Sequence, residues 1–419
     1  MNIDSALDKI ISYFKQAYSN LYSGNADFSV PFNKKIIDQA YIKYSKKIEG
    51  DDTFIASFGR SSAQFYCQSV LRSKMAKTTM ELLSAVALPF CLIFWYLKSW
   101  GRETRKTKHC DGVKFIPGKD GPYFEIPDHL KCYKIENYNR KSGYLTNDDI
   151  RLVRQIILFA FKDNVNKFKF LFLIKIFYNL STLRRLLDTY EMSFCCFYME
   201  YNFSSSVLTW YLNSYGIKAY NIMHGEKFYY CRDAFVSFNR FYVWNSFYAD
   251  QFKIMYANAD YIIFQPGRFS LNLSKEIKRN VGIIFPSMSR DEDEMSEFIE
   301  MIKRLSSDSR VVSLRFHPSY IHIFNRYREL LPQTVRICNP HEQSIRTFLD
   351  ENDIIIGFYS TVLVEAAMNG RYAIYIKDKY CDSIEDYYFI FKHDNVLIYQ
   401  PHEITLSLLN TLVPEGTSI

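Results

Sequence analysis

Four groups of polar residues each follow a short apolar segment, and their side chains could bind a phosphate or move a proton. The groups are Glu200 with the serines after it, His224-Gly225-Glu226, Arg315-Phe316-His317-Pro318, and Ser360-Thr361 with Glu365 one turn later. Short apolar segments of this kind are typical of buried strands in a parallel sheet. Ligands of such sheets bind outside the carboxyl ends of the strands, so the shared position indicates function more strongly than any one group does.

Ser360 and Thr361 open an expected helix directly after a strand that ends at Gly357. Their hydroxyls would lie beside unpaired backbone N–H groups at the positive end of the helix dipole, which makes a potential phosphate seat. The alternative is that Ser360 only caps the helix, the commonest role of serine there. The sequence contains neither GxxxxGK[ST] nor GxGxxG, which excludes a P-loop nucleotidase and argues against a dinucleotide dehydrogenase.

His317 follows an apolar strand and precedes Pro318, which cannot continue regular strand pairing. Here the ring could donate a hydrogen bond to a phosphate oxygen, and Arg315 lies two residues back on the same strand face. The alternative is a strand-terminal histidine whose ring is satisfied by the backbone. The functional interpretation adds Arg315, His317 and Pro318 to the phosphate-binding group.

Three residues compete for the role of general base. His224 precedes Gly225, which permits a tight turn or a close ligand, and histidine titrates near neutral pH. It is the natural base for an alcohol acceptor, with a capping or structural role as the alternative. Glu226 and Glu200 are rival bases, although carboxylates at strand ends are more often solvated or salt-bridged.

The elements that would position these residues alternate as short strands and helices in two series. The first has strands at Phe194–Met199 and Ile217–Met223 around a helix at Ser204–Tyr215, a βαβ unit with parallel strands. The second starts near Val281 and ends near Ile376, which predicts an α/β fold with a doubly wound parallel sheet. The expected boundary between the series lies near Pro266 to Leu273.

Two other segments carry simpler expectations. Thr53–Phe58 is an apolar run that predicts a short strand before a helix. Residues 106–149 hold many Gly, Pro, Asp and Asn residues, which favour loops or small hairpins.

Two apolar stretches raise the question of a membrane. Leu82–Leu97 is uncharged, but it is shorter than the roughly 20 residues of a spanning helix. We therefore expect a buried core helix, with a membrane-dipping or spanning helix as alternatives. Lys162–Arg185 mixes Phe and Leu with Lys and Arg, which fits a basic helix at a membrane surface and a core helix equally well.

Composition excludes several classes of protein. Hydrophobic residues make up 48% and charged residues 23%, a balance that rules out wholesale disorder. The nine cysteines show no CxxC spacing, so they give no zinc-site pattern and argue against a disulfide framework. The net charge of +7 suits an anionic ligand or membrane surface and is too small to require nucleic acid. The first residues show no secretory signal, so a cytoplasmic protein is expected.

Five motifs, taken in order, resemble landmarks of GT-B glycosyltransferases, particularly those that use CMP- or CDP-activated donors. The motifs are Met223-His-Gly-Glu226, Phe241-Tyr-Val-Trp-Asn245, Arg315-Phe-His-Pro318, Ile354-Ile-Ile-Gly-Phe-Tyr-Ser-Thr361 and Glu365-Ala-Ala-Met-Asn-Gly370. In the bacterial sialyl- and polysialyltransferases that these motifs resemble, an HP pair and a Ser-Ser/Thr pair hold the nucleotide and phosphate of the donor. The similar CDP-glycerol glycerophosphotransferases add an HG histidine regarded as the base. The resemblance covers roughly residues 194–380.

The resemblance implies two Rossmann-like domains facing across a cleft, at residues 1–270 and 271–419, with extra helices in the first. It implies a metal-independent, inverting glycosyltransferase without a cofactor. The favoured reaction moves sialic acid or a similar acidic sugar from a CMP donor to a carbohydrate or lipid-linked acceptor in capsule, O-antigen or lipooligosaccharide synthesis. Such an enzyme would be cytoplasmic, and we expect it to touch the inner face of the membrane through Lys162–Arg185 or through the apolar run that begins at Leu82.

Three alternatives stay open at the level of the sequence. A CDP-glycerol-type polyol-phosphate transferase would use the same residue groups. A sugar-nucleotide epimerase has a similar two-domain build, and a non-catalytic membrane-associated assembly protein would bind no nucleotide.

Overall fold

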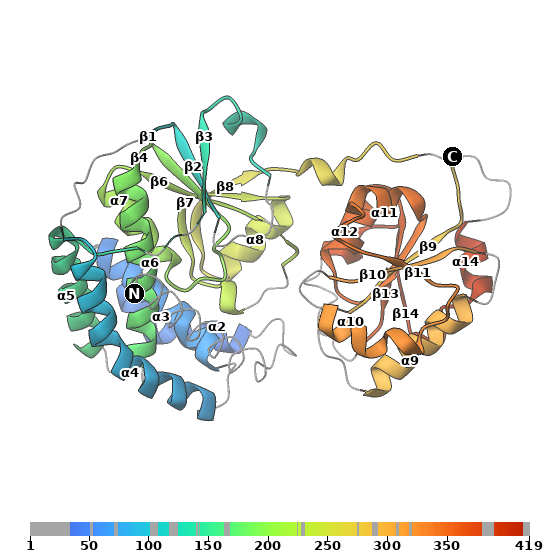
Figure 1. The fold of residues 1–419 in the computed structure, drawn as a ribbon, viewed down its shortest axis with the longest axis horizontal. Helices are drawn as coiled ribbons and strands as arrows, with labels where there is room; N and C mark the ends of the chain where they lie inside the picture. The colour runs from blue at the N-terminus through green and yellow to red at the C-terminus, as the bar shows by residue number, and fades with distance from the viewer. Residues whose placement is uncertain are drawn as a thin grey trace, which may run out of the picture. The chain divides into compact units, whose positions relative to one another are not determined.

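The chain divides into two compact units, each built around its own sheet (Figure 1). The first unit spans Met1–His224 and Tyr229–Phe264, and the second spans Gly225–Phe228 and Gln265–Ile419. The computed structural model describes residues 34–50, 53–70, 74–100, 108–116, 125–139, 141, 143–162, 168–223, 225–227, 231–274, 276–286, 292–306, 310–317, 321–378 and 389–413.

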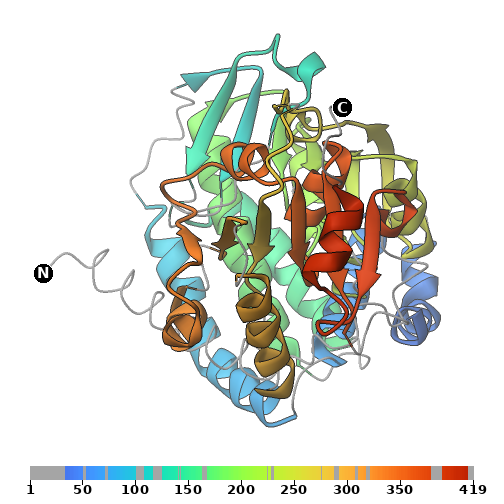
Figure 2. The ribbon, with the colours of Figure 1, turned by 90° about the vertical axis from the view of Figure 1, so that its right-hand side faces the viewer.

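The second unit contains a six-stranded sheet in which every pair of neighbouring strands is parallel. The strands are β9 (Val281–Ile284), β10 (Val312–Arg315), β11 (Arg336–Cys338), β12 (Ile354–Gly357), β13 (Tyr372–Ile376) and β14 (Val396–Tyr399). They lie in the order β11-β10-β9-β12-β13-β14, side by side in Figure 2. Counted within the unit this is 3-2-1-4-5-6, the strand order of a Rossmann fold, and it reverses direction between β9 and β12.

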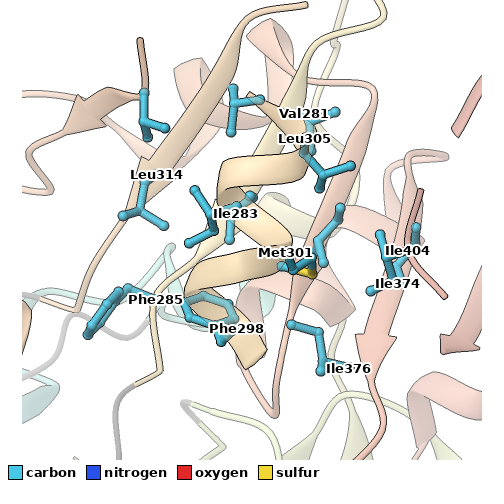
Figure 3. Close-up of a cluster of buried hydrophobic side chains, with 14 of the residues drawn as sticks. Val281, Ile283, Phe285, Phe298, Met301, Leu305, Leu314, Ile374, Ile376 and Ile404 are labelled. Carbon is cyan, nitrogen blue, oxygen red and sulfur yellow. The ribbon is translucent and has the colours of Figure 1, made fainter. Parts of the chain in front are cut away.

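Helices and short connections cover this sheet, and its four central strands β10, β9, β12 and β13 are almost wholly buried. The helices are α9 (Glu292–Leu305), α10 (Ile321–Tyr327), α11 (Ile345–Glu351), α12 (Thr361–Met368) and α14 (Leu406–Leu412). Helix α9 has acidic residues in its first turn and basic residues in its last, as the helix dipole favours. Its apolar face packs Phe298, Met301 and Leu305 onto Ile283 and Leu314 of the strands (Figure 3).

The first unit has a second six-stranded sheet, also with parallel neighbours throughout. Its strands are β2 (Gly112–Ile116), β3 (Ile135–Asn139), β5 (Phe194–Phe197), β6 (Lys218–Ile222), β7 (Ser237–Val243) and β8 (Asn258–Ile263). Their order is β3-β2-β5-β6-β7-β8. The short strands β1 (Lys108–His109) and β4 (Tyr190–Glu191) form a separate parallel pair.

Seven helices of the described residues belong to the first unit: α2 (Lys34–Ile48), α3 (Thr53–Val70), α4 (Lys74–Leu97), α5 (Asn147–Lys162), α6 (Lys169–Thr189), α7 (Ser205–Ser214) and α8 (Ser246–Ile254). Ring contacts between aromatic side chains connect several of these helices. The ring of Phe172 on α6 lies edge-on to Phe58 of α3 and stacks on Phe203, two residues before α7. Aromatic residues make up 17% of the sequence, and these rings contribute to the packing between the helices.

The structure confirms the predicted α/β class with Rossmann-like domains, and it confirms the βαβ unit of β5, α7 and β6. The second predicted series is also present, since β9 begins at Val281 and β13 ends at Ile376, with β10, β11 and β12 between them. The prediction that the two domains face each other across a cleft stays a prediction.

Two local predictions in the first unit are wrong. Thr53–Phe58 is not a strand but the first turns of α3, which buries Phe54, Phe58 and Phe65. Residues 106–149 are not only loops, because they contain β2, β3 and the start of α5. Strand β2 escaped notice because Lys114, which is itself buried, interrupts its apolar sequence.

The two apolar stretches also differ from each other. The Lys162–Arg185 stretch contains most of α6, which is a core helix with Leu171, Phe172 and Ile176 buried. The Leu82–Leu97 stretch belongs to α4, and the expectation of a buried core helix is wrong there. Many of its large apolar side chains are exposed. By length and composition alone, α4 is the one helix in the described ranges that could cross a membrane.

Candidate functional site

A pocket with a volume of about 230 Å³ opens at the carboxyl ends of β9, β10 and β12 in the second unit. Its lining residues are Ile284, Phe285, Pro286, Arg315, Phe316, His317, Pro340, Ile345, Phe358, Tyr359, Ser360, Val362 and Glu365. The strand order reverses between β9 and β12, and ligands of open α/β sheets bind at such a point. The pocket therefore lies where the topology alone would place a ligand.

Beside the pocket, two strands approach each other closely at Ile284, which lines it, and Gly357. A Cβ atom added to Gly357, the last residue of β12, would lie 3.0 Å from Cβ of Ile284 on β9. Real Cβ atoms rarely approach so closely, so a side chain at this position would push the strands apart. Glycine thus keeps the two strand ends together beneath the turn that leads into α12.

Ser360 is the N-cap of α12. Its backbone is extended, and its Oγ accepts a hydrogen bond from the Val362 N–H at 3.2 Å. Tyr359, Ser360 and Val362 all line the pocket, so the positive end of the helix dipole borders it. The sequence offered helix capping and phosphate binding as alternative roles of Ser360. In this geometry the two roles are compatible.

Arg315 supplies a positive charge to the pocket from the end of β10. Its Nη1 donates to the backbone carbonyl of Gln343 at 2.8 Å, which fixes the guanidinium against the loop after β11. Burial lowers the pKa of Arg315, while the nearby Cys338 and Glu365 raise it in part. Arginine stays protonated in proteins, so burial here concentrates a cation in a poorly solvated place.

His317 follows two residues later and also lines the pocket. Partial burial lowers the pKa of its ring below the usual value, although part of the side chain stays exposed. At neutral pH the ring is therefore mainly neutral and can donate one hydrogen bond from one nitrogen. An anion bound beside it would raise its pKa again.

Glu365 borders the same pocket from the second turn of α12 and is almost fully buried. Its Oε1 lies 3.4 Å from Nε of Arg268, and the Arg268 carbonyl accepts a hydrogen bond from Nδ2 of Asn369. A carboxylate repels a phosphate but accepts hydrogen bonds from hydroxyls. Within the predicted donor site, Glu365 suits a sugar or ribose hydroxyl better than a phosphate.

The loop that contains Glu226 belongs to the second unit and contacts the first turn of α12. The Glu226 N–H donates to Oγ1 of Thr361 at 3.2 Å, and the Tyr359 hydroxyl donates to the Glu226 carbonyl at 2.9 Å. Two residue groups that are far apart in sequence, the second and the fourth, are thus in contact. Thr361 does not line the pocket itself but anchors this loop beside it.

Glu200, the remaining candidate base, lies in the first unit at the end of β5 and is fully buried. Its Oε2 accepts a hydrogen bond from Nδ2 of Asn221 at 2.9 Å, and its backbone carbonyl accepts one from Nε2 of Gln64 at 2.7 Å. These contacts tie β5, β6 and α3 together. They give Glu200 a structural role whether or not it has a catalytic one.

His224 and Pro318 lie outside the described residues, so their predicted roles stay predictions. Among the residues that are described, no three His, Cys, Asp or Glu side chains are grouped as metal ligands. Sequence reasoning quoted Tyr359 only within the Ile354–Thr361 motif and gave it no role, and it did not name Gln343. Tyr359 holds the Glu226 loop, and Gln343 holds Arg315. The position of Tyr359 in the turn between β12 and α12 was the available signal.

Comparisons with known proteins leave the family open. No protein-family model matches this sequence, and no curated protein matches it. Among solved structures, the spinosyn forosaminyltransferase SpnP is similar with 10% identity over 73% of this chain and 91% of its own, at a TM-score of 0.42. MurG of Acinetobacter baumannii is similar with 13% identity over 73% and 89% of the two chains, at a TM-score of 0.33.

The UDP-N-acetylglucosamine 2-epimerase of Rickettsia bellii is similar to the same degree, with 10% identity over 74% and 90% of the chains and a TM-score of 0.42. Solved structures of glycosyltransferases and of an epimerase are thus similar to this chain to about the same low degree. The fold is therefore assigned from the sheet topology of this chain, and the function is argued from its own site.

Proposed function

We propose that this protein is a nucleotide-sugar-dependent glycosyltransferase whose second unit binds the donor. The observation that carries the proposal is the pocket at the switch point of a Rossmann-ordered sheet. It brings together the cation of Arg315, the ring of His317 and the N-terminus of α12. All three favour negative charge, and a nucleotide donor carries that charge on its phosphate.

The favoured donor is a CMP-linked acidic sugar such as sialic acid. Its support is the resemblance of the His317-Pro318 and Ser360-Thr361 pairs to the donor-binding pairs of bacterial sialyl- and polysialyltransferases. The acceptor we propose is a carbohydrate of capsule, O-antigen or lipooligosaccharide synthesis. The resemblance places the acceptor side of the site in the first unit.

The proposed reaction is a direct displacement at the anomeric carbon. The acceptor oxygen forms a bond to this carbon while the bond from the carbon to the phosphate oxygen breaks, and the nucleotide leaves as CMP. The electron pair of the broken bond adds charge to the leaving phosphate. Arg315, His317 and the dipole of α12 would stabilise this charge most strongly in the transition state. A base removes the proton of the acceptor hydroxyl.

His224 is our first choice for that base, followed by Glu226 and Glu200. Glu226 gains support because its loop is fixed to Tyr359 and Thr361 beside the pocket. Glu200 loses support because its side chain is fully buried and its carboxylate accepts a hydrogen bond from Asn221. If His224 is the base, His224→Ala lowers kcat and leaves nucleotide affinity nearly unchanged. Loss of nucleotide binding in this variant would move the role to Glu226.

Calorimetric titration with CMP, CDP, UDP and GDP tests the proposal directly. We expect saturable binding of a cytidine nucleotide and about fivefold weaker binding in Ser360→Ala, which loses one hydrogen bond near the phosphate. Thr405→Ala is the matched control, because Thr405 caps α14 in the same way but does not line the pocket. Binding of no nucleotide would contradict the proposal and favour a non-catalytic assembly protein.

Product analysis separates the glycosyltransferase from a polyol-phosphate transferase and from an epimerase. Turnover of CDP-glycerol in preference to CMP-sialate would identify a polyol-phosphate transferase. Conversion of a sugar nucleotide to its epimer without any acceptor would identify an epimerase. Either result would replace the glycosyltransferase while keeping the same pocket.

A further inference from the structure

The outer face of α4 is a continuous apolar stripe on the surface of the first unit. From Leu82 to Leu97, every exposed residue of the helix is apolar, with exposed fractions of 65% at Leu82, 68% at Val86 and 70% at Phe90. Leu82, Val86, Phe90, Ile93 and Leu97 follow one another in steps of three and four, which places them on one face. At 1.5 Å per residue the stripe is about 22 Å long.

The inner face of α4 fixes the helix to its unit. Met80, Ser84, Leu88 and Trp95 are buried, and the Trp95 carbonyl accepts a hydrogen bond from the Leu145 N–H at 3.0 Å. The inner face thus includes a serine, whereas every exposed side chain between Leu82 and Leu97 is apolar. This is the reverse of the usual surface helix, whose outer face is polar.

The acidic residue of α4 points away from the stripe. Glu81 accepts hydrogen bonds at its two carboxylate oxygens from the N–H groups of Phe170 and Leu171, each at 2.9 Å. It therefore caps the N-terminus of α6 inside the unit. No other acidic residue occurs on α4, so no negative charge opposes an anionic surface from this helix.

Cations lie at both ends of the stripe. Lys74 and Lys77 occupy the first turn of α4, and Lys98 follows its last residue. The ammonium groups of Lys77 and Lys98 lie over the rings of Phe168 and Phe94. Trp100, which is 70% exposed, extends the apolar surface beyond the helix.

We propose that α4 lies in the plane of an anionic lipid bilayer, with its apolar stripe below the headgroups and its lysines among them. A bilayer surface matches both properties of this face, because it is apolar inside and negatively charged outside. The helix docks and does not cross, since its other face is packed on α6 and on the segment before α5. This inference does not rest on the proposed function.

Sedimentation with lipid vesicles tests the proposal without any nucleotide. We expect the full chain to bind vesicles with about one third anionic lipid, and binding to weaken several-fold when salt screens the lysines. Phe90→Glu and Val86→Glu should each lower the partition coefficient about tenfold or more. Both positions are exposed, so these variants should fold, and circular dichroism checks that they do.

Ile42→Glu is the matched control. Ile42 is 76% exposed on α2, another helix rich in lysine, but it stands alone rather than in a stripe. This variant should bind vesicles like the original protein. Equal losses in Ile42→Glu and Phe90→Glu would show a general charge effect and overturn the proposal.

Quenching by brominated lipid reports whether the face inserts. Of the four tryptophans, Trp100 is exposed, Trp210 is half-buried, and Trp95 and Trp244 are buried. Quenching of tryptophan fluorescence that disappears in Trp100→Phe therefore places the end of α4 in the lipid. An absence of binding to anionic vesicles would end the proposal. So would a lipid-free dimer that Phe90→Glu dissociates, because the stripe would then be covered by a second copy of the chain.

Discussion

The two units share a parallel six-stranded sheet but use the polar residues at their strand ends differently. In the first unit, Glu200 and Asn221 are fully buried and bond to each other. In the second, Arg315 and His317 lie at the end of β10 and line a pocket. The difference shows that a polar strand end marks a possible site, and that only the surrounding packing decides whether a ligand can reach it.

The connections to each sheet explain the difference. Gln64 from α3 reaches the strand ends of the first unit and donates to the Glu200 and Arg232 carbonyls, which fills the space there. In the second unit, β12 ends at Gly357, which has no side chain, directly before the turn that leads into α12. The first unit uses its polar groups for internal order, and the second keeps them accessible.

The largest expected effect is a loss of stability that is confined to the second unit. Asp353 accepts hydrogen bonds from the N–H groups of Lys278 and Arg279 and pairs with Arg371 at 2.9 Å. Asp353→Ala leaves the Arg371 cation buried without this partner, which should cost about 3 kcal/mol. Urea denaturation measures the loss. Hydrogen exchange should show it in β9 and β12 but not in β5 and β6.

Glu300→Ala is the control for this variant. Glu300 pairs with Lys303 on the exposed face of α9, and such a surface pair contributes less than about 1 kcal/mol. If Asp353→Ala were as mild as this control, the ion pair would not hold the second unit together.

The next effect concerns activity and the pocket. His317→Ala removes a hydrogen-bond donor from the proposed phosphate site, so we expect a higher donor KM and a lower kcat. Together these should reduce kcat/KM about a hundredfold, as loss of one donor to a developing oxyanion does. Steady-state kinetics with the donor varied give both values. A normal kcat/KM in this variant would remove His317 from the site.

A smaller effect is expected at the buried strand end of the first unit. Glu200→Leu leaves Nδ2 of Asn221 without this acceptor, which should cost about 2 kcal/mol of stability. Nucleotide affinity should stay unchanged, because the pocket belongs to the second unit. Paired urea denaturation and calorimetric titration test both statements. Weaker nucleotide binding at unchanged stability would show that Glu200 serves ligand binding and not the packing of the first unit.

The smallest effect is a pH dependence of nucleotide binding. Partial burial lowers the pKa of His317 in the empty site, and a bound phosphate should raise it. The complex then binds more protons than the free protein between these two pKa values, so affinity should rise as the pH falls through that window and stay flat above it. His317→Asn should lose this rise, while the titration of the nucleotide itself remains.

The fold of the second unit could be predicted from the sequence because its strands and helices are separated by clear signals. Pro286 follows β9, and Ser360 caps α12 where the apolar run of β12 ends. Strands β11 and β14 gave weaker signals, since only Cys338 is buried in β11 and β14 is half-buried throughout. Local patterns locate buried central strands better than edge strands.

The first unit was harder to predict for two physical reasons. The six residues Thr53–Phe58 are too few to distinguish a period of two from a period of 3.6, and the helical spacing shows only with Phe65 included. The error at α4 has another cause. An apolar helix is expected to be buried in a protein that is surrounded by water. Only the structure shows that many of the large side chains of α4 are exposed.

The contacts of Glu226 have a consequence for the order in which the chain is made. Its partners Tyr359 and Thr361 follow it by 133 and 135 residues. At typical translation rates these residues emerge on the order of ten seconds later. The strands β2 to β8 can pair during this interval, but the Glu226 loop cannot reach its final conformation. A chain interrupted before Tyr359 would therefore contain all the strands of the first sheet but lack the contacts that hold the Glu226 loop.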